Sequence, residues 1–140
     1  MALIRSLLGG KVKIETWPRL SPVNHSSVPA SKRIITDSGE LAQIYNSTDP
    51  IHLVAYLELV QECIRGGHYH LNKDEWIYII RGEMDLTVQD IDTSEKDNCK
   101  VTEGDLIFIG RRTAHSIKTT KAGHAIEFSS RMHDPLDTLR

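Results

Sequence analysis

Residues 65–83 read RGGHYHLNKDEWIYIIRGE, and this stretch decides the fold. Within it, His68 and His70 occupy alternate positions of an expected strand, so both imidazoles lie on the same face of a sheet. A short turn over 71–74 separates them from Glu75, which opens the next strand and can return its carboxylate to that face. We therefore expect two imidazoles and one carboxylate to lie together.

A third imidazole comes from a distant part of the chain. His115 begins an expected strand after the turn at 110–114. Three neutral imidazoles and one carboxylate would form a mixed nitrogen and oxygen site for a divalent first-row metal, with positions left for water or substrate. Iron, manganese, nickel, zinc and copper all accept such ligands, so we expect one divalent transition metal ion of unspecified identity.

Two spaced motifs of this chain resemble the pair that marks the cupin family. They consist of ligand-type residues and glycines at matching intervals, namely His68-x-His70-x4-Glu75-x6-Gly82 and then Gly104-Asp105 followed by His115. The resemblance implies a small double-stranded β-helix of the RmlC-like class, in which the three histidines and the glutamate are the metal ligands. The second motif departs from the usual pattern, because Gly110 and Arg112 stand where the family commonly has a proline and then a glycine.

The rest of the chain shows the strand pattern that such a barrel needs. Short apolar runs separated by turn-forming residues recur along it, and no long segment has helical periodicity. We predict an all-β cupin or jelly-roll barrel over 37–130, with an N-terminal arm and edge strand over 1–36 and a C-terminal tail over 131–140. The expected strands are 11–16, 41–45, 52–60, 75–80, 83–91, 105–109, 116–119 and 124–128.

Three shorter segments have expectations of their own. The apolar run over 2–8 permits a helix, although a helix there could not organise the fold. Prolines and serines over 21–37 indicate an irregular arm that crosses a surface. The polar and charged stretch over 92–98 is expected to form the exposed tip of a hairpin.

Length and composition exclude several classes of protein. The 140 residues, 39% hydrophobic and 26% charged, indicate one globular domain. A formal net charge of −2 leaves no basic excess for binding nucleic acid. Neither a secretory signal nor an apolar run of about 18 residues is evident, so we expect a cytoplasmic protein without a membrane segment. Cys63 and Cys99 are too few for a disulfide scaffold, and we expect reduced thiols.

The strand over 75–80 is apolar on both faces, with Ile77 and Ile79 on one face and Trp76 and Tyr78 on the other. Both faces should therefore be covered, one by the barrel interior and one by a second sheet or another subunit. We expect a homodimer with Trp76 and Tyr78 near its interface.

Arg111 and Arg112 would lie near the barrel mouth, where they could recognise a carboxylate or a phosphate of a ligand. An ordinary solvated loop is the competing interpretation of this pair.

Other polar residues on neighbouring strands are candidates for acid, base or anchor roles, or else are surface residues and a buried tyrosine. These candidates are Tyr56, Glu58, Glu62 and Arg65. His124 and Glu127 could support the metal ligands, but their spacing of three places them on opposite faces of a regular strand.

Three functions fit this site. The first is Lewis-acid catalysis of the isomerase, epimerase or lyase type on a sugar, a nucleotide sugar or a keto acid. In its favour, residues 65–70 followed by Arg81-Gly-Glu83 look like the cupins of capsular and nucleotide-sugar biosynthesis. The alternatives are an iron-dependent dioxygenase and a non-catalytic accessory protein that binds a metal or a small metabolite.

Overall fold

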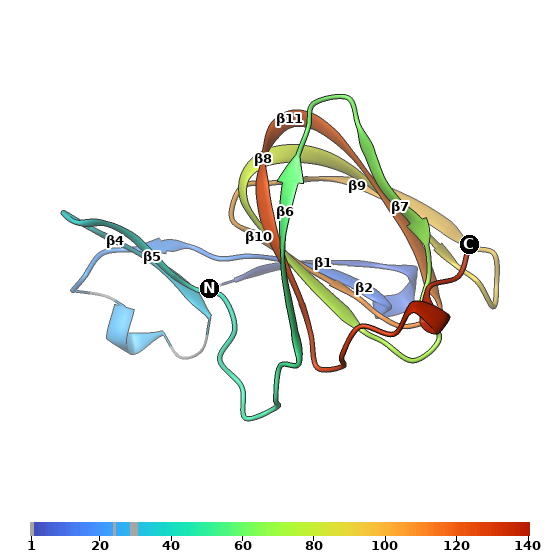
Figure 1. Ribbon diagram of the computed structural model, residues 1–140. Coiled ribbons are helices and arrows are strands. Elements are labelled where there is room, and N and C mark those ends of the chain that lie inside the picture. Colours follow the sequence, from blue (N-terminus) through green and yellow to red (C-terminus); the bar gives the residue numbers. More distant parts are fainter. Residues whose placement is uncertain (1, 24, 29–30) are drawn as a thin grey trace.

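A computed structural model describes residues 2–23, 25–28 and 31–140 (Figure 1). Within these ranges the regular structure consists of strands and short 3-10 helices, and no helix has the length and hydropathy needed to cross a membrane. The strands are β1 (Leu3–Leu7), β2 (Val12–Thr16), β3 (Arg19–Leu20), β4 (Lys32–Thr36), β5 (Gly39–Gln43), β6 (Leu53–Leu59), β7 (Ile64–His68), β8 (Glu75–Asp90), β9 (Lys96–Thr102), β10 (Asp105–Ile109) and β11 (Thr113–Ser129). The 3-10 helices are η1 (Leu8–Gly10), η2 (His25–Ser27) and η3 (Pro135–Asp137).

The barrel is built on β8 and β11. These strands are 16 and 17 residues long and pair antiparallel along most of their length. The main sheet has the order β1-β2-β10-β8-β11-β6, while β9 pairs with β8 and β7 pairs with β11 off this path. Because each long strand has one neighbour near its start and another near its end, the sheet curls over itself, as Figure 1 shows. The predicted all-β barrel is confirmed.

Each long strand bends where the sequence suggested a break. The register between β8 and β11 shifts repeatedly between Thr119 and Ala125. A Cβ atom on Gly123 would lie 1.8 Å from the carbonyl oxygen of Arg81, so only glycine permits this approach. The strand breaks predicted at Gly82 and Gly123 were wrong, because these two glycines bend β8 and β11 without ending them. Four predicted strands therefore merge in pairs, 75–80 with 83–91 and 116–119 with 124–128.

Aliphatic side chains fill the barrel interior. They come from both halves of the curled sheet, and burial of each contributes about 1.5–3 kcal/mol relative to exposure. The most deeply buried are Val12, Ile14, Leu59, Ile77, Ile79, Met84, Leu86, Val88, Val101, Ile107 and Ile109.

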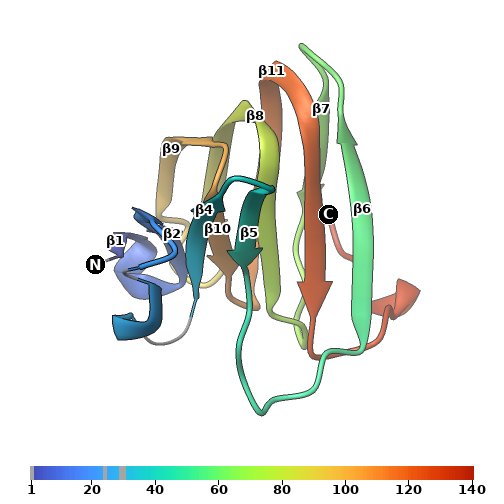
Figure 2. The same ribbon diagram turned by 90° about the vertical axis from the view of Figure 1, so that its left-hand side faces the viewer.

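The outer face of β8 is covered by the same chain. Tyr78 and Phe128 are buried in a second apolar cluster, where Tyr45 and Ile44 pack from the segment that follows β5. Trp76 stacks on Phe128 at 5.7 Å between ring centroids. Figure 2 shows β4 and β5 crossing in front of the sheet that contains β8 and β10. Both faces of 75–80 are thus covered as expected, but by this chain's own second layer, so Trp76 and Tyr78 no longer argue for a subunit interface. The homodimer itself stays a prediction.

The N-terminal segment differs from the prediction. Residues 3–7 form β1, and not the helix that their sequence permits, because η1 turns the chain back and pairs Leu3 with Thr16 of β2. Since β2 also pairs with β10, the first strands belong to the barrel sheet.

The arm is more regular than expected. It contains η2 and β4, and its boundary at residue 36 falls inside the β4–β5 hairpin. Asn24, Pro29 and Ala30 of this arm lie outside the described residues. The expected hairpin tip over 92–98 is exposed, although β9 begins within it.

Replacing Gly123 with alanine should reduce the free energy of unfolding by about 3 kcal/mol, because the new Cβ would displace the Arg81 backbone at the bend. Urea denaturation measures this loss. Gly39→Ala is the matched control, since a Cβ at Gly39 meets no atom within 4 Å and only its φ of +114° is strained, at a cost of about 1 kcal/mol. Equal losses in the two variants would contradict the steric explanation of the bend.

Candidate metal centre

Three imidazoles and one carboxylate converge at one end of the barrel, as the sequence predicted. His68 ends β7, His70 follows it, Glu75 begins β8 and His115 lies near the start of β11. One ligand atom from each of the four lies within 4.8 Å of the other three. His70, Glu75 and His115 are buried, while His68 is half-buried. The convergence is geometric, and metal binding by these residues stays a prediction.

The close approach of β7 to β11 brings His68 beside His115. The two residues are register partners, and their ring centroids are 4.8 Å apart. Gly66 permits this approach, because a Cβ there would lie 2.6 Å from the carbonyl oxygen of His115. Its φ of +91° also favours glycine. The Gly-Gly pair that precedes the histidines in the sequence is therefore part of the geometry of the site.

The ring of His70 is held in one orientation by the C-terminal segment. Its Nδ1 lies 2.6 Å from the backbone carbonyl of Asp137, which can only accept a hydrogen bond. Nδ1 therefore carries a proton, and in the neutral ring Nε2 presents a lone pair. That Nε2 lies 3.1 Å from Oε1 of Glu75, itself an acceptor.

His115 repeats the same arrangement. Its Nδ1 lies 3.2 Å from the backbone carbonyl of Thr113, which again fixes the proton on Nδ1. Its Nε2 lies 3.0 Å from Oε2 of Glu75, yet this buried oxygen accepts no aligned hydrogen bond. Two lone-pair nitrogens thus face one carboxylate, and such acceptors share a small space only with a proton or a metal ion between them.

This arrangement fits a divalent metal ion. Histidine ligands commonly donate their second ring N–H to a backbone carbonyl, which fixes the tautomer, and His70 and His115 both do so. The orphaned Oε2 of Glu75 supplies an anionic oxygen to the same space. The donor set of three nitrogens and one oxygen suits first-row divalent ions.

The charge states of the cluster follow from burial and from contact. Burial lowers the pKa of His68 to about 4, with further lowering by neighbouring His115 and His70, so this imidazole is neutral at pH 7. Burial opposes ionisation of Glu75, but the close contacts with His115, His70 and Glu127 outweigh it and hold the pKa of Glu75 below its ordinary value. Burial also lowers the pKa of His70, but its hydrogen bonds with Glu75 and the Asp137 carbonyl raise it overall.

Two further polar side chains adjoin Glu75. Nζ of Lys73 lies 3.1 Å from Oε1 of Glu75, with only 8% of the lysine side chain exposed. Glu127 faces the barrel interior, where burial, a hydrogen bond to Glu75 and the charge of that carboxylate raise the pKa of Glu127 to about 7. No sequence pattern selects Lys73, because a position two residues before a candidate ligand does not by itself predict a contact with it.

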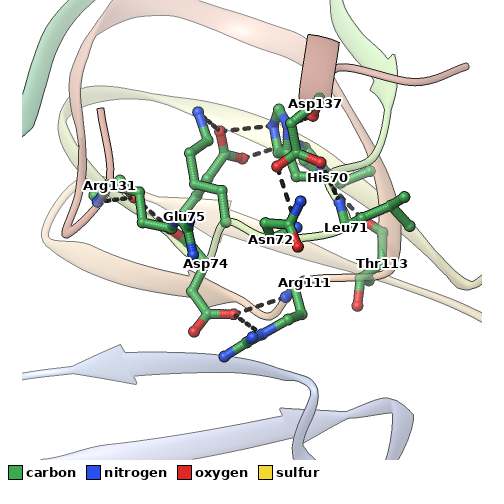
Figure 3. Close-up of polar contacts among 12 residues, drawn as sticks. His70, Leu71, Asn72, Asp74, Glu75, Arg111, Thr113, Arg131 and Asp137 are labelled. Carbon is green, nitrogen blue, oxygen red and sulfur yellow. Dashed lines mark hydrogen bonds and ion pairs between the residues drawn. The ribbon is translucent and has the colours of Figure 1, made fainter. Parts of the chain in front are cut away.

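The C-terminal segment closes one side of the cluster (Figure 3). The carboxylate of Asp137 accepts hydrogen bonds from the backbone N–H groups of Leu71 and Asn72, at 2.8 and 3.1 Å. Leu139 pairs with Tyr69 by two backbone hydrogen bonds. The predicted tail over 131–140 is thus a structural part of the site, which sequence reasoning missed because no local pattern tells where a tail returns.

Arg111 and Arg112 lie on the loop beside the site, with their side chains occupied at the surface. The guanidinium of Arg112 pairs with both carboxylate oxygens of Asp92, and Nε of Arg111 lies 3.7 Å from Asp74. The backbone N–H of Arg112 donates to the His70 carbonyl at 2.6 Å, so this loop does support the centre. Anion recognition by the two arginines stays a prediction.

The other polar candidates do not point into the site, and the structure corrects that expectation. Tyr56 and Glu58 are exposed on the outer face of β6, because the alternate residues of that strand face the core. Glu62 is exposed and pairs with Lys118. Arg65 is exposed and donates to the backbone carbonyl of Glu58.

His124 and Glu127 occupy opposite faces of β11, as their spacing predicted. Glu127 contacts Glu75 inside the barrel, whereas the ring of His124 lies 6.0 Å from that of Tyr56 outside it. Of this pair, Glu127 alone adjoins the cluster.

A cavity of about 320 Å³ lies against His70, between the loop after this residue and the C-terminal segment. His70, Asn72 and Lys73 line one side, and Arg131 and His133 line the other. A larger cavity of about 470 Å³ is lined by none of the cluster residues and lies outside the barrel. Two cavities thus adjoin the cluster, the one of about 320 Å³ at His70 and one of about 220 Å³ at His115.

Comparisons with known proteins agree with this architecture. Residues 37–130 match the model of the polysaccharide biosynthesis C-terminal domain family. No match was found among curated proteins.

Several solved structures are similar over most of this chain. A dTDP-4-dehydrorhamnose 3,5-epimerase from Sulfolobus tokodaii has a TM-score of 0.76 at 14% identity, covering 98% of this chain and 80% of the epimerase. An RmlC 3,5-epimerase from Legionella pneumophila, in complex with dTDP-4-keto-L-rhamnose, has a TM-score of 0.73 at 13% identity, covering 99% and 76%. A TDP-quinovose 3,4-ketoisomerase from Campylobacter jejuni has a TM-score of 0.70 at 18% identity, covering 79% and 88%. These likenesses confirm the RmlC-like cupin fold.

Replacing His68 and His70 together with alanine should remove bound divalent metal, because two of the four ligands are lost. Metal per chain, measured by plasma mass spectrometry, should fall from about one to near zero. The variant should also lose about 3 kcal/mol of metal-dependent stability at a free metal concentration of about 100 Kd. His52→Ala, an exposed histidine outside the cluster, is the control. Metal content equal to that of the control would overturn the ligand assignment.

Replacing Asp137 with alanine should weaken metal affinity about 10–100-fold, because loss of its carboxylate frees the segment whose carbonyl orients His70. Calorimetric titration with zinc or nickel measures this. Asp97→Ala, at an exposed position of β9, should leave the affinity unchanged. Unchanged affinity in Asp137→Ala would show that the ring keeps its orientation without this contact.

Proposed function

This chain belongs to the polysaccharide biosynthesis C-terminal domain family, and from that premise we propose that it is a divalent-metal-dependent isomerase or epimerase of a nucleotide-linked keto sugar. One observation carries the proposal. Two imidazole lone pairs, fixed by backbone carbonyls, face the buried carboxylate of Glu75, and that arrangement calls for a cation. The 3,5-epimerases and 3,4-ketoisomerases of similar fold support the choice of substrate class.

His68, His70, Glu75 and His115 would hold the ion. A divalent ion bound there supplies a Lewis acid for the carbonyl group of a keto sugar. The carbonyls of Asp137 and Thr113 keep the rings oriented, so the ligands need little reorganisation on binding. The C-terminal segment limits water access on one side of the centre, and the cavity beside Lys73 admits the ligand.

The test uses exchange of carbon-bound hydrogen with solvent, which isomerases and epimerases of keto sugars catalyse whatever their product. The metal-loaded protein is incubated in D₂O with dTDP-4-keto-6-deoxyglucose and with its UDP counterpart. We expect deuterium to enter the sugar next to the carbonyl, detected by mass spectrometry. In metal-free protein the rate of deuterium incorporation should fall by about 100-fold or more, because removal of one electrostatic contact to the reacting oxygen typically slows catalysis by at least that factor.

Controls separate this function from its alternatives. Tyr56→Phe, on the outer face of β6, should exchange deuterium like the wild type. Oxygen consumption without deuterium incorporation would replace the proposal with a dioxygenase. Sugar and metal binding with neither reaction would replace it with an accessory protein.

A further inference from the structure

We propose that Lys73 restricts Glu75 to a single metal-binding oxygen, so that the centre keeps two positions for a ligand that binds through two neighbouring oxygens. The inference rests on the metal centre of the proposed function. It adds a specificity residue to that centre and narrows its substrate class to compounds with a carbonyl and an adjacent hydroxyl group.

The two oxygens of Glu75 have different surroundings. Oε1 forms an ion pair with Nζ of Lys73 at 3.1 Å and also lies 3.1 Å from Nε2 of His70. Oε2 is buried without an aligned hydrogen bond and lies 3.0 Å from Nε2 of His115. A lysine nitrogen cannot bind a metal while protonated. The Lys73 ammonium therefore competes with an ion for Oε1, and Oε2 is the oxygen left for the ion.

The side chain of Lys73 has little freedom to move away from Glu75. Its side chain is 8% exposed and that of Glu75 is 2% exposed, so water cannot readily replace either partner of the pair. Separating a buried pair of this kind leaves an unpaired charge, which is strongly unfavourable. The contact between Nζ and Oε1 should thus persist when a metal binds at Oε2.

The contact between Lys73 and Glu75 affects how many coordination positions of the metal ion stay open for a ligand. Four protein ligand atoms leave two positions on an ion that prefers about six ligands, whereas a carboxylate bound through both oxygens would leave one. A carbonyl oxygen and a neighbouring hydroxyl can fill two adjacent positions together. Lys73 also lines the cavity that lies against His70, so it is placed to contact a ligand that approaches the centre from that side.

A lysine is otherwise a poor neighbour for a metal ion. Its positive charge opposes the cation across a few ångströms, which lowers affinity for the ion. A site evolved only to bind metal tightly gains nothing from this residue. The burial of Lys73 against Glu75 is explained if open coordination positions for a ligand are more important to this site than high affinity for the metal ion.

The test compares Lys73→Met, which keeps the length of the side chain without a donor, with Lys73→Gln, which keeps a neutral N–H donor. Lys118→Met on the exposed surface of β11 is the matched control. Each protein is loaded with Ni²⁺ and titrated with acetohydroxamate, which binds through two oxygens, and with azide, which binds through one atom. Metal content, circular dichroism and thermal melting are measured on the same samples.

We expect Lys73→Met to lose acetohydroxamate affinity by about tenfold or more, with azide and Ni²⁺ affinities no weaker than in the wild type. Lys73→Gln and Lys118→Met should bind acetohydroxamate like the wild type. In Mn²⁺-loaded protein, water proton relaxation should report about two bound waters in the wild type and about one in Lys73→Met.

The outcomes distinguish the two proposals. Equal acetohydroxamate affinity and equal bound water in folded, metal-loaded wild type and Lys73→Met overturn the role of Lys73 and leave the metal centre intact. Should Lys73→Met fail to fold, Lys73→Leu, which also lacks a donor, takes its place: loss of acetohydroxamate affinity and of one bound water supports the role, and wild-type values of both overturn it. Absence of bound metal from the wild type overturns the proposed centre and this inference together.

Discussion

The buried carboxylate of Glu75 has to be balanced by positive charge, and the organisation of the site follows from that requirement. An ionised carboxylate removed from water is costly unless it is paired or bound to a metal. Here it faces His70, His115 and Lys73 within 3.1 Å. Lys73 supplies one positive charge at Oε1. Because backbone carbonyls fix the protons of both rings on their far nitrogens, the neutral rings present lone pairs to the carboxylate, and Oε2 is left without a partner. A divalent ion would satisfy the two lone pairs and Oε2 together.

The strands of the barrel hold the four side chains of this cluster in fixed positions. β8 and β11 are long enough to carry a core along their length and a polar centre at one end. The glycine bend lets the same two strands take different neighbours on either side, so that β7 can place His68 against His115. Rigid strands fix ligand positions better than loops do, which reduces reorganisation on binding. The C-terminal segment then completes the shell around His70.

Prediction from the sequence succeeded where periodicity and spacing carry the information. Alternation along a strand places His68 and His70 together and separates His124 from Glu127, and the structure agrees. Prediction failed at glycines, because a glycine can either end a strand or bend it. The same residue that ends a strand elsewhere bends β8 and β11 here, since the outcome depends on the opposing backbone. The helix that the apolar run over 2–8 permits does not form, because pairing of β1 with β2 outweighs local preference.

Strand periodicity and motif spacing were enough to predict the barrel, the four converging side chains and the chemistry that their donor atoms permit. The groups that surround those four became visible in the folded chain alone. The contacts of Glu75 with Lys73 and Glu127, and of His70 with Asp137, depend on how two strands register and where a tail returns. Such contacts join residues up to 67 positions apart, and their energies arise from burial and fixed geometry, which no local pattern encodes.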